Sequence, residues 1–515
     1  MKKMIHAGGI TILVASLIGC SSGSSSPQPT GGQTESTSNQ ANANASAPAG
    51  APRSSESTGM ADYALTKQSS SRKNDMYFQD YGTNPFVSTA KDNLSTFAAD
   101  VDTGSYTVMR NYVKDGSLPP AEAVRVEEFI NYFPSAYAAP EKNTFAIQAD
   151  GGPSPFHKGN QLVRIGIKGK EIAVEERKPA HLVFVIDVSG SMNREDRLEL
   201  VKKSLHVLVD QLQPSDTVGI VVYGSQGRVL LTPTSAEDKQ TILAAITSLS
   251  PEGSTNAEEG LSLGYEIASR SFESGAINRV ILCSDGVANV GETGAEGILR
   301  SIEDYARKDI YLSTFGFGMG NYNDVLMEQL ANKGEGHYAY IDSFSEARRV
   351  FTEALTGTLQ TIARDVKIQV EFDPKQVDSY RLLGYENRDV RDEDFRNDKT
   401  DAGEVGAGHS VTALYEVKLK AADTTDIGTV RIRYHNPTSQ KVEEVSQSVQ
   451  VQNALAPDLK FLASVAEFAE ILRKSPSAEE SSLPDVLKLA ESSAQGEHQL
   501  EFVRLVKDSL AIRGH

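Results

Sequence analysis

The run FVIDVSGSM, from Phe184 to Met192, places an aspartate and two serines directly after a short apolar stretch. Asp187 is followed by hydroxyl groups at alternate positions, Ser189 and Ser191. A carboxylate with neighbouring hydroxyls can hold a hard divalent cation, whereas a serine beside a general base can act as a nucleophile. The same residue types are also common in a tight turn after a strand. The surrounding elements must decide among these three interpretations.

Two other loops carry oxygen donors that could join this run. The stretch PEGSTNAEEG contains Thr255 just before a predicted helix, and the stretch CSDG contains Asp285 at the end of a predicted strand. The combined set of candidate metal ligands is Asp187, Ser189, Ser191, Thr255 and Asp285. Carboxylates and hydroxyls suit Mg²⁺, which prefers hard oxygen ligands. The five candidate ligands include neither imidazole nor thiolate groups, which argues against zinc or copper.

A regular alternation of apolar runs and amphipathic helices, from about residue 181 to 359, must position these loops. The strands are predicted at 181–187, 217–224, 228–232, 279–285, 309–318 and 336–342. The helices are predicted near 195–212, 236–249, 256–272, 294–307, 322–333 and 344–362. This pattern indicates an α/β fold with a Rossmann-like, doubly wound, mostly parallel sheet covered by helices on both faces. A short link between the second and third strands predicts a hairpin and one antiparallel edge. Ligands bind such sheets beyond the carboxyl ends of the strands, where Asp187 lies.

The three loops resemble the metal-ion-dependent adhesion site (MIDAS) of von Willebrand factor type A (VWA) domains. The resemblance rests on DVSGS from Asp187, GSTN from Gly253 and SDG from Ser284, in that order along the chain. It implies that the five candidates bind Mg²⁺, or else Mn²⁺ or Ca²⁺, directly or through water. It also implies a protein partner whose exposed Asp or Glu completes the metal shell. Many family members have Gly in place of Ser254 and Thr in place of Ser284, but neither position is a core ligand.

The flanking segments resemble bacterial lipoproteins of the YfbK-like type. The resemblance rests on NLSTFAADVDTGSYTVMRNYV, SLPPAEAVRVEEFINYF and RLLGYENRDV. It implies family-specific domains before and after the central VWA domain, and it specifies the fold better than the function.

The flanks themselves predict a β-rich region accompanied by helical N- and C-terminal segments. A helix is predicted at 121–133, where Pro134 follows as a stop signal. Alternating apolar and polar residues predict strands at 144–150, 161–169, 365–372, 410–420, 428–435 and 443–451. Helices are predicted at 459–474 and about 500–512. We hypothesise that the strands before and after the α/β unit share one sheet system, so that the α/β domain is an insertion.

The N-terminus carries a processing signal. Lys2 and Lys3 precede a short apolar segment, Ile10–Ile18, which is too short to span a bilayer permanently. The segment ends in LIGC, which resembles a bacterial lipobox and implies removal of the signal peptide and lipidation, for example with palmitate, of Cys20. No other apolar run is long enough for a transmembrane helix. Cys283 follows an apolar run and is predicted to be a buried small side chain.

The predicted organisation has five parts. They are a signal peptide at 1–19, a disordered tether rich in Ser, Thr, Pro, Gly and Asn at 20–74, an N-terminal VWA-associated domain (helical, then β) at 75–176, the VWA domain at 177–362, and a C-terminal domain (β-rich, then helical) at 363–515. The chain is expected in the bacterial cell envelope, held to the membrane by its lipid. Because Ser21 follows Cys20, resemblance to Gram-negative sorting favours the outer membrane, on its periplasmic or surface face.

The predicted function is that of a membrane-anchored protein-binding module, and not an enzyme. The formal net charge of −18 becomes −20 once Lys2 and Lys3 are removed, which argues against nucleic-acid binding. A metal-independent envelope scaffold remains the alternative, and a hydrolase is a second one. GCSSG at 19–23 straddles the lipobox and enters the tether, where no strand or helix could build a nucleophile elbow. DTGS at 102–105 lacks the second aspartate that aspartic proteases need, and the SxxK at 88–91 lacks its partner motifs.

Overall fold

The computed structural model describes residues 76–286, 294–320 and 322–514, which belong to one compact unit. Cys20 and the segments predicted as signal peptide and tether lie outside these residues. Within the described ranges, no helix combines the length and the apolar character needed to cross a bilayer.

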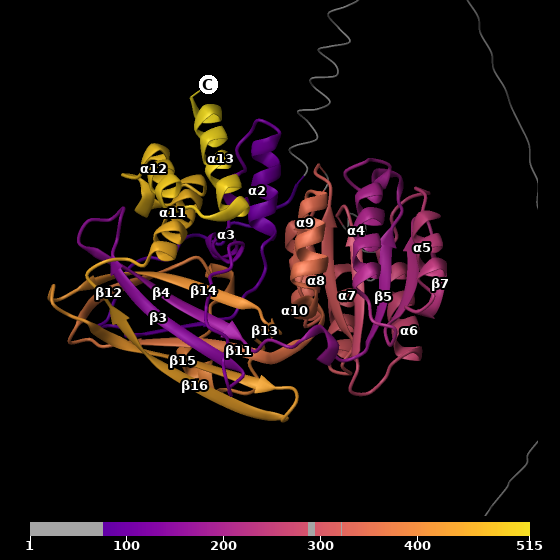
Figure 1. Ribbon diagram of the computed structural model, residues 1–515, viewed down its shortest axis with the longest axis horizontal. Coiled ribbons are helices and arrows are strands. Elements are labelled where there is room, and N and C mark those ends of the chain that lie inside the picture. The colour runs from indigo at the N-terminus through magenta and orange to yellow at the C-terminus, as the bar shows by residue number, and fades with distance from the viewer. Residues whose placement is uncertain (1–75, 287–293, 321, 515) are drawn as a thin grey trace, which may run out of the picture. The chain divides into compact units, whose positions relative to one another are not determined.

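A six-stranded sheet forms the middle of the α/β domain (Figure 1). Its strands are β5 (Ala180–Asp187), β6 (Thr217–Tyr223), β7 (Gly227–Ser235), β8 (Ile277–Ser284), β9 (Tyr311–Phe317) and β10 (Tyr338–Ile341). They lie in the order β10-β9-β8-β5-β6-β7, and only β7 pairs antiparallel to its neighbour. The mostly parallel, Rossmann-like sheet with an antiparallel edge hairpin is thus confirmed.

Helices cover both faces of this sheet because its central strand is apolar on both sides. Phe184 and Ile186 pack into one core, while Val183 and Val185 pack into the other. The first core is closed by α4 (Leu198–Gln211), α5 (Lys239–Thr247), α9 (Phe344–Arg348), a π-helical turn (Arg349–Glu353) and α10 (Leu355–Leu359). The second is closed by α6 (Ala257–Arg270), α7 (Gly294–Ala306) and α8 (Asp324–Lys333).

The strands on either side of the α/β domain form one further sheet of ten strands. They are β1 (Val87–Ser88), β2 (Leu94–Ala98), β3 (Phe145–Pro153), β4 (Asn160–Gly169), β11 (Thr361–Phe372), β12 (Val377–Leu383), β13 (Gly403–Gly406), β14 (Ser410–Leu419), β15 (Asp426–Asn436) and β16 (Lys441–Val451). β4 pairs with β14 over its length, and β3 meets β16 (Figure 1). The hypothesis of a shared sheet with an inserted α/β domain is therefore confirmed.

This larger sheet folds back on itself around one apolar core. Phe372 of β11 and Tyr415 of β14 have ring centroids 5.4 Å apart, although β4, β3, β16 and β15 lie between their strands in the sheet order. Such a contact requires the two ends of the sheet to face each other. The N-terminal part also differs from the expected helix-then-strand order, because β1 and β2 precede its helices.

Helices from both ends of the chain share a fourth core. They are α2 (Gly104–Lys114), α3 (Val126–Asn131), α11 (Pro457–Leu472), α12 (Leu483–Ser493) and α13 (Gly496–Arg513). Phe133, Phe461 and Phe502 meet edge to face in it, with centroids 5.1–5.7 Å apart.

The single helix predicted at 121–133 is wrong in its first half. A 3₁₀ turn at Ala121–Ala123 is followed by an extended segment, and α3 begins only at Val126. The cause is a tertiary contact: the Ser105 hydroxyl donates to the Ala123 carbonyl at 2.6 Å and accepts the Arg125 amide at 2.9 Å. These bonds hold the backbone in a conformation that a continuous helix would not allow.

The DTGS motif has a structural role at the start of α2. Asp102 is buried, accepts the backbone N–H of Tyr338 at 3.0 Å and lies 3.3 Å from the Arg388 guanidinium. A side chain on Gly104 would come within 2.4 Å of the Tyr338 ring. The motif therefore joins α2 closely to β10 of the α/β domain.

A buried arginine completes this junction. Arg110 of α2 contacts Asp342 at 2.5 Å and Glu346 at 2.9 Å, and all three side chains are at most 2% exposed. Asp342 directly follows β10, and Glu346 lies on α9. Removing one partner of a buried ion pair leaves an uncompensated charge away from water.

We predict that Arg110→Met lowers the free energy of unfolding by about 3–5 kcal/mol, because the buried Asp342 would lose its closest cation and Glu346 would keep only Arg349. Urea denaturation followed by circular dichroism measures the change. Arg270→Met is the matched control, since Arg270 is 69% exposed and pairs with Glu266 on the surface of α6. The control should change stability by less than about 0.5 kcal/mol. Equal effects of the two variants would contradict the predicted role of Arg110.

Candidate functional site

Two carboxylates lie together at the carboxyl ends of neighbouring parallel strands. Asp187 is the last residue of β5, and Asp285 directly follows β8. Ile186 and Cys283 are register partners, so the chain brings both loops to the same edge of the sheet. Asp187 is 0% exposed and Asp285 is 2% exposed. We call this edge the crest.

Neutral groups surround the Asp187 carboxylate. Its Oδ1 accepts the Ser189 amide at 2.8 Å, and its Oδ2 accepts the Ser284 hydroxyl at 3.0 Å. The Tyr223 hydroxyl lies 3.4 Å from the same Oδ2. The sequence did not predict Ser284 or Tyr223 as site residues, because each is the last residue of an ordinary apolar strand.

The serine hydroxyls predicted as ligands face each other. The Oγ atoms of Ser189 and Ser191 are 3.0 Å apart, and either one can donate. Within the described residues, neither hydroxyl is hydrogen-bonded to a histidine. The arrangement therefore provides adjacent oxygen donors beside Asp187, the kind of ligand that a hard divalent cation prefers.

The second loop is joined to the first through the backbone. The Gly190 amide donates to the Gly253 carbonyl at 3.1 Å, and the Glu252 amide donates to the Val188 carbonyl at 2.5 Å. Gly253 has φ of +68°, and a Cβ there would lie 2.2 Å from the Ser225 hydroxyl. Glycine is required at this position, because any other residue would meet both strain and a clash.

Thr255 follows this anchored turn by two residues. It is half-buried and directly precedes Asn256, whose side chain caps α6 by accepting the Glu259 amide. The Ser254 amide donates to the Ser225 hydroxyl at 3.0 Å, which ties the turn to the loop after β6. The structure thus brings Asp187, Ser189, Ser191 and Asp285 to one crest, with Thr255 on the adjoining loop.

Arg197 is a crest residue that the sequence analysis missed. Its Nη1 donates to Asp285 Oδ2 and, at 2.9 Å, to the Ser191 carbonyl, and its Nη2 donates to the Met319 carbonyl at 2.6 Å. The side chain is 5% exposed. A signal existed: Arg197 stands directly before α4, where the helix dipole disfavours a cation unless an acid is near.

Burial and charge oppose ionisation at the crest. Burial, followed by the charge of Asp285, raises the pKa of Asp187 to about 6. Burial also raises the pKa of Asp285, although Arg197 acts in the opposite direction. The crest therefore has one arginine for two buried carboxylates. Arg197 pairs with Asp285, while Asp187 accepts hydrogen bonds only from neutral donors. These hard oxygen donors with unneutralised charge fit a divalent cation such as Mg²⁺.

A second acidic group lies elsewhere. Carboxylate oxygens of Glu335, Asp401 and Glu404 come within 4.8 Å of one another. Asp401 is largely exposed, and the other two are half-buried. This cluster was not predicted from the sequence, since Glu335 lies more than sixty residues before Asp401 and Glu404.

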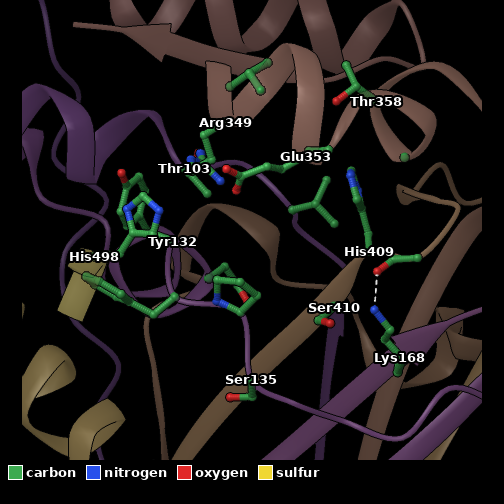
Figure 2. A pocket seen from close by; sticks show the side chains of 18 of the residues that line it. Thr103, Tyr132, Ser135, Lys168, Arg349, Glu353, Thr358, His409, Ser410 and His498 are labelled. Carbon is green, nitrogen blue, oxygen red and sulfur yellow. Dashed lines mark hydrogen bonds between the residues drawn. The ribbon is translucent and has the colours of Figure 1, made fainter. Parts of the chain in front are cut away.

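A cavity of about 600 Å³ is separate from the crest residues (Figure 2). None of the five predicted site residues lines it. Lys168 in its wall donates to the Gly408 carbonyl at 2.6 Å, which the dashed line in Figure 2 marks. Burial lowers the pKa of His337 to about 4 and that of His409 to about 3, so both imidazoles are neutral at pH 7. The cavity wall does not contain the pair of carboxylates with neighbouring hydroxyls that marks the crest.

Three family models match the chain. The von Willebrand factor type A domain matches residues 181–353, which include all five predicted crest residues. The C-terminal model of the uncharacterized protein YfbK matches residues 357–512, and a model described as von Willebrand factor matches residues 72–164. The chain therefore contains a VWA domain, and its C-terminal part is of the YfbK type.

Comparison with whole proteins agrees. The chain is 37% identical to the uncharacterized protein YfbK of Escherichia coli, over 84% of this chain and 80% of that protein. It is 25% identical to the uncharacterized protein sll0103 of Synechocystis sp., over 60% of this chain and 75% of that protein. A solved structure, von Willebrand factor type A from Catenulispora acidiphila, is 16% identical, with a TM-score of 0.44 over 73% of this chain and 91% of that one.

We predict that Asp187→Asn stabilises the metal-free protein at pH 7, by on the order of 2–3 kcal/mol. A carboxyl whose pKa is raised on folding opposes folding once pH exceeds the pKa of the unfolded state, so the gain should vanish as pH falls from 6 towards 4. Urea denaturation in EDTA at several pH values measures it. Asp238→Asn, at the exposed cap of α5, should give no such gain, since hydrogen bonds from Thr241 lower the pKa of Asp238. A pH-independent difference for Asp187→Asn would contradict the prediction.

Proposed function

The chain belongs to the family of Escherichia coli YfbK and contains a von Willebrand factor type A domain, and from this premise we propose that its crest is a metal-dependent site for binding a protein partner. The observation that carries the proposal is the pair of buried carboxylates, Asp187 and Asp285, flanked by hydroxyls and only partly neutralised by Arg197. A divalent cation would relieve this excess of negative charge.

The residues that would hold the ion are Asp187, Ser189, Ser191, Thr255 and Asp285. Mg²⁺ is the ion we propose, with Mn²⁺ or Ca²⁺ as substitutes. The bound ion would supply an electrophilic position that accepts a carboxylate oxygen from an Asp or Glu of the partner. The chain's own contribution is to keep the Asp187 carboxylate oriented through Ser189 and Ser284.

The proposed role is binding and not catalysis. The Ser189 and Ser191 hydroxyls face each other beside two buried carboxylates, an arrangement of hard oxygen donors that favours cation binding. A metal-independent envelope scaffold is the competing proposal, and the metal titration below separates the two.

We further propose that lipid on Cys20 holds the protein to a membrane of the cell envelope, which is the outer membrane in a Gram-negative cell. The composition of residues 21–73 supports a flexible tether, which would average about 40 Å from end to end. The VWA domain would thereby reach a partner some distance from the membrane surface.

Isothermal titration with Mg²⁺ or Mn²⁺ should show binding to the wild-type protein and none to Asp187→Ala, because the central carboxylate is lost. Asp196→Ala is the control: it removes an exposed carboxylate, 47% accessible, from the same loop and should bind as the wild type does. Heat that survives Asp187→Ala unchanged would refute the crest as the metal site. Glu404→Gln would then test the acidic cluster as its source.

Cys20→Ser should move the protein from the detergent phase to the aqueous phase in a Triton X-114 partition and abolish the lipid-modified N-terminal peptide in mass spectrometry. Cys283→Ser is the matched control, since Cys283 is fully buried in β8 and should leave partitioning unchanged. Detergent-phase recovery of the Cys20→Ser protein would contradict lipid anchoring through this residue.

A further inference from the structure

The side chain of Arg197 is fixed by more than its ion pair. Of its three acceptors, one is the Asp285 carboxylate and the other two are the backbone carbonyls of Ser191 and Met319. Its aliphatic part crosses Gly318, where φ is +73° and a Cβ would lie 2.4 Å from Arg197 Cγ. A cation arriving at Asp285 would leave both carbonyl bonds and the glycine contact intact. The guanidinium would therefore stay on the crest if the Asp285 carboxylate turned to bind a metal.

Two exposed ion pairs lie on the loops next to the crest. Arg194 pairs with Asp196, and Arg228 pairs with Glu252. All four side chains are 45–50% exposed, so solvent screens them strongly. The buried charges that act on a crest ligand at close range are those of Asp187, Asp285 and Arg197.

These three charges define a simple sequence of states. The two carboxylates and the arginine together carry −1. A divalent cation changes the total to +1, and one carboxylate from a partner then brings it to zero. Without Arg197 the same three states would carry −2, 0 and −1. Buried sites favour neutrality, because an uncompensated charge loses its hydration.

We propose that Arg197 couples the two binding events at the crest, by weakening the binding of the divalent cation alone and strengthening the binding of an acidic ligand to the loaded site. The inference rests on the proposed metal site and specifies its regulation. The loaded crest would carry one positive charge until an Asp or Glu side chain arrives. By linkage, the acidic ligand would tighten the metal by the same factor as the metal tightens the ligand.

The test is Mn²⁺ binding to the purified protein, with and without the blocked peptide acetyl-Gly-Glu-Gly-amide. In the wild type, the peptide should tighten Mn²⁺, whereas its Gln analogue should not. Arg197→Gln should bind Mn²⁺ alone at least about tenfold more tightly than the wild type, because a unit charge has left a poorly screened site. The glutamate peptide should no longer tighten Mn²⁺ in this variant.

Two further variants separate charge from packing. Arg197→Lys keeps the charge and should bind Mn²⁺ as weakly as the wild type. Arg194→Gln makes the same substitution as the first variant three residues away, at a side chain 48% exposed, and should match the wild type. Near-ultraviolet circular dichroism checks that Arg197→Gln folds. If it does not fold, the coupling role is still tested by the peptide effect on the wild type and by the Mn²⁺ affinity of Arg197→Lys.

The outcomes distinguish this inference from the proposed function. Mn²⁺ affinity of Arg197→Gln equal to or below that of the wild type overturns the coupling role but leaves the metal site standing. So does a wild-type protein that binds Mn²⁺ but ignores the glutamate peptide, or an Arg197→Lys variant that binds tenfold more tightly. Absence of Mn²⁺ binding in both wild type and Arg197→Gln overturns the metal site and the coupling together.

Discussion

The burial of two carboxylates at one edge of a parallel sheet is the constraint on which the crest depends. Asp187 and Asp285 are almost inaccessible to water, yet Asp187 has only neutral hydrogen-bond donors. Proteins rarely keep such charge without a partner, because hydration is lost and little replaces it. Arg197 neutralises one of the two carboxylates. The helix dipole disfavours a cation at the start of α4, and the ion pair with Asp285 offsets this effect.

The part of the site that the sequence predicts is the part fixed by local order and sheet topology. Asp187, Ser189 and Ser191 belong to one turn after an apolar strand, and parallel strands bring Asp285 to the same edge. The α/β domain was equally predictable, since apolar strands buried on both faces differ clearly from amphipathic helices. A shared sheet could be predicted because alternating strands occur on both flanks of the α/β unit, but the particular pairing of β4 with β14 was not predicted.

Features set by distant contacts were beyond the sequence. The role of Arg197 depends on Met319 and Gly318, more than a hundred residues away. The break before α3 depends on the Ser105 hydroxyl, which competes with the helix for backbone groups that local propensity would assign to it. In each case a side chain hydrogen-bonds or pairs with a segment distant in the sequence. The spacing of apolar and polar residues along the chain does not predict such contacts.

The inserted α/β domain is held to the rest of the protein at both ends of its sheet. At the end where β5 begins, the two chain crossings are joined, because the Lys178 amide donates to the Gln360 side chain at 3.1 Å. At the opposite end, Arg110 binds Asp342 just beyond β10, on the same edge as the crest. β5 runs between these ends over eight residues, about 26 Å. Rotation of the domain would require exposing or separating the buried Arg110 pair, so this ion pair opposes movement of the domain relative to the larger sheet and the terminal helices.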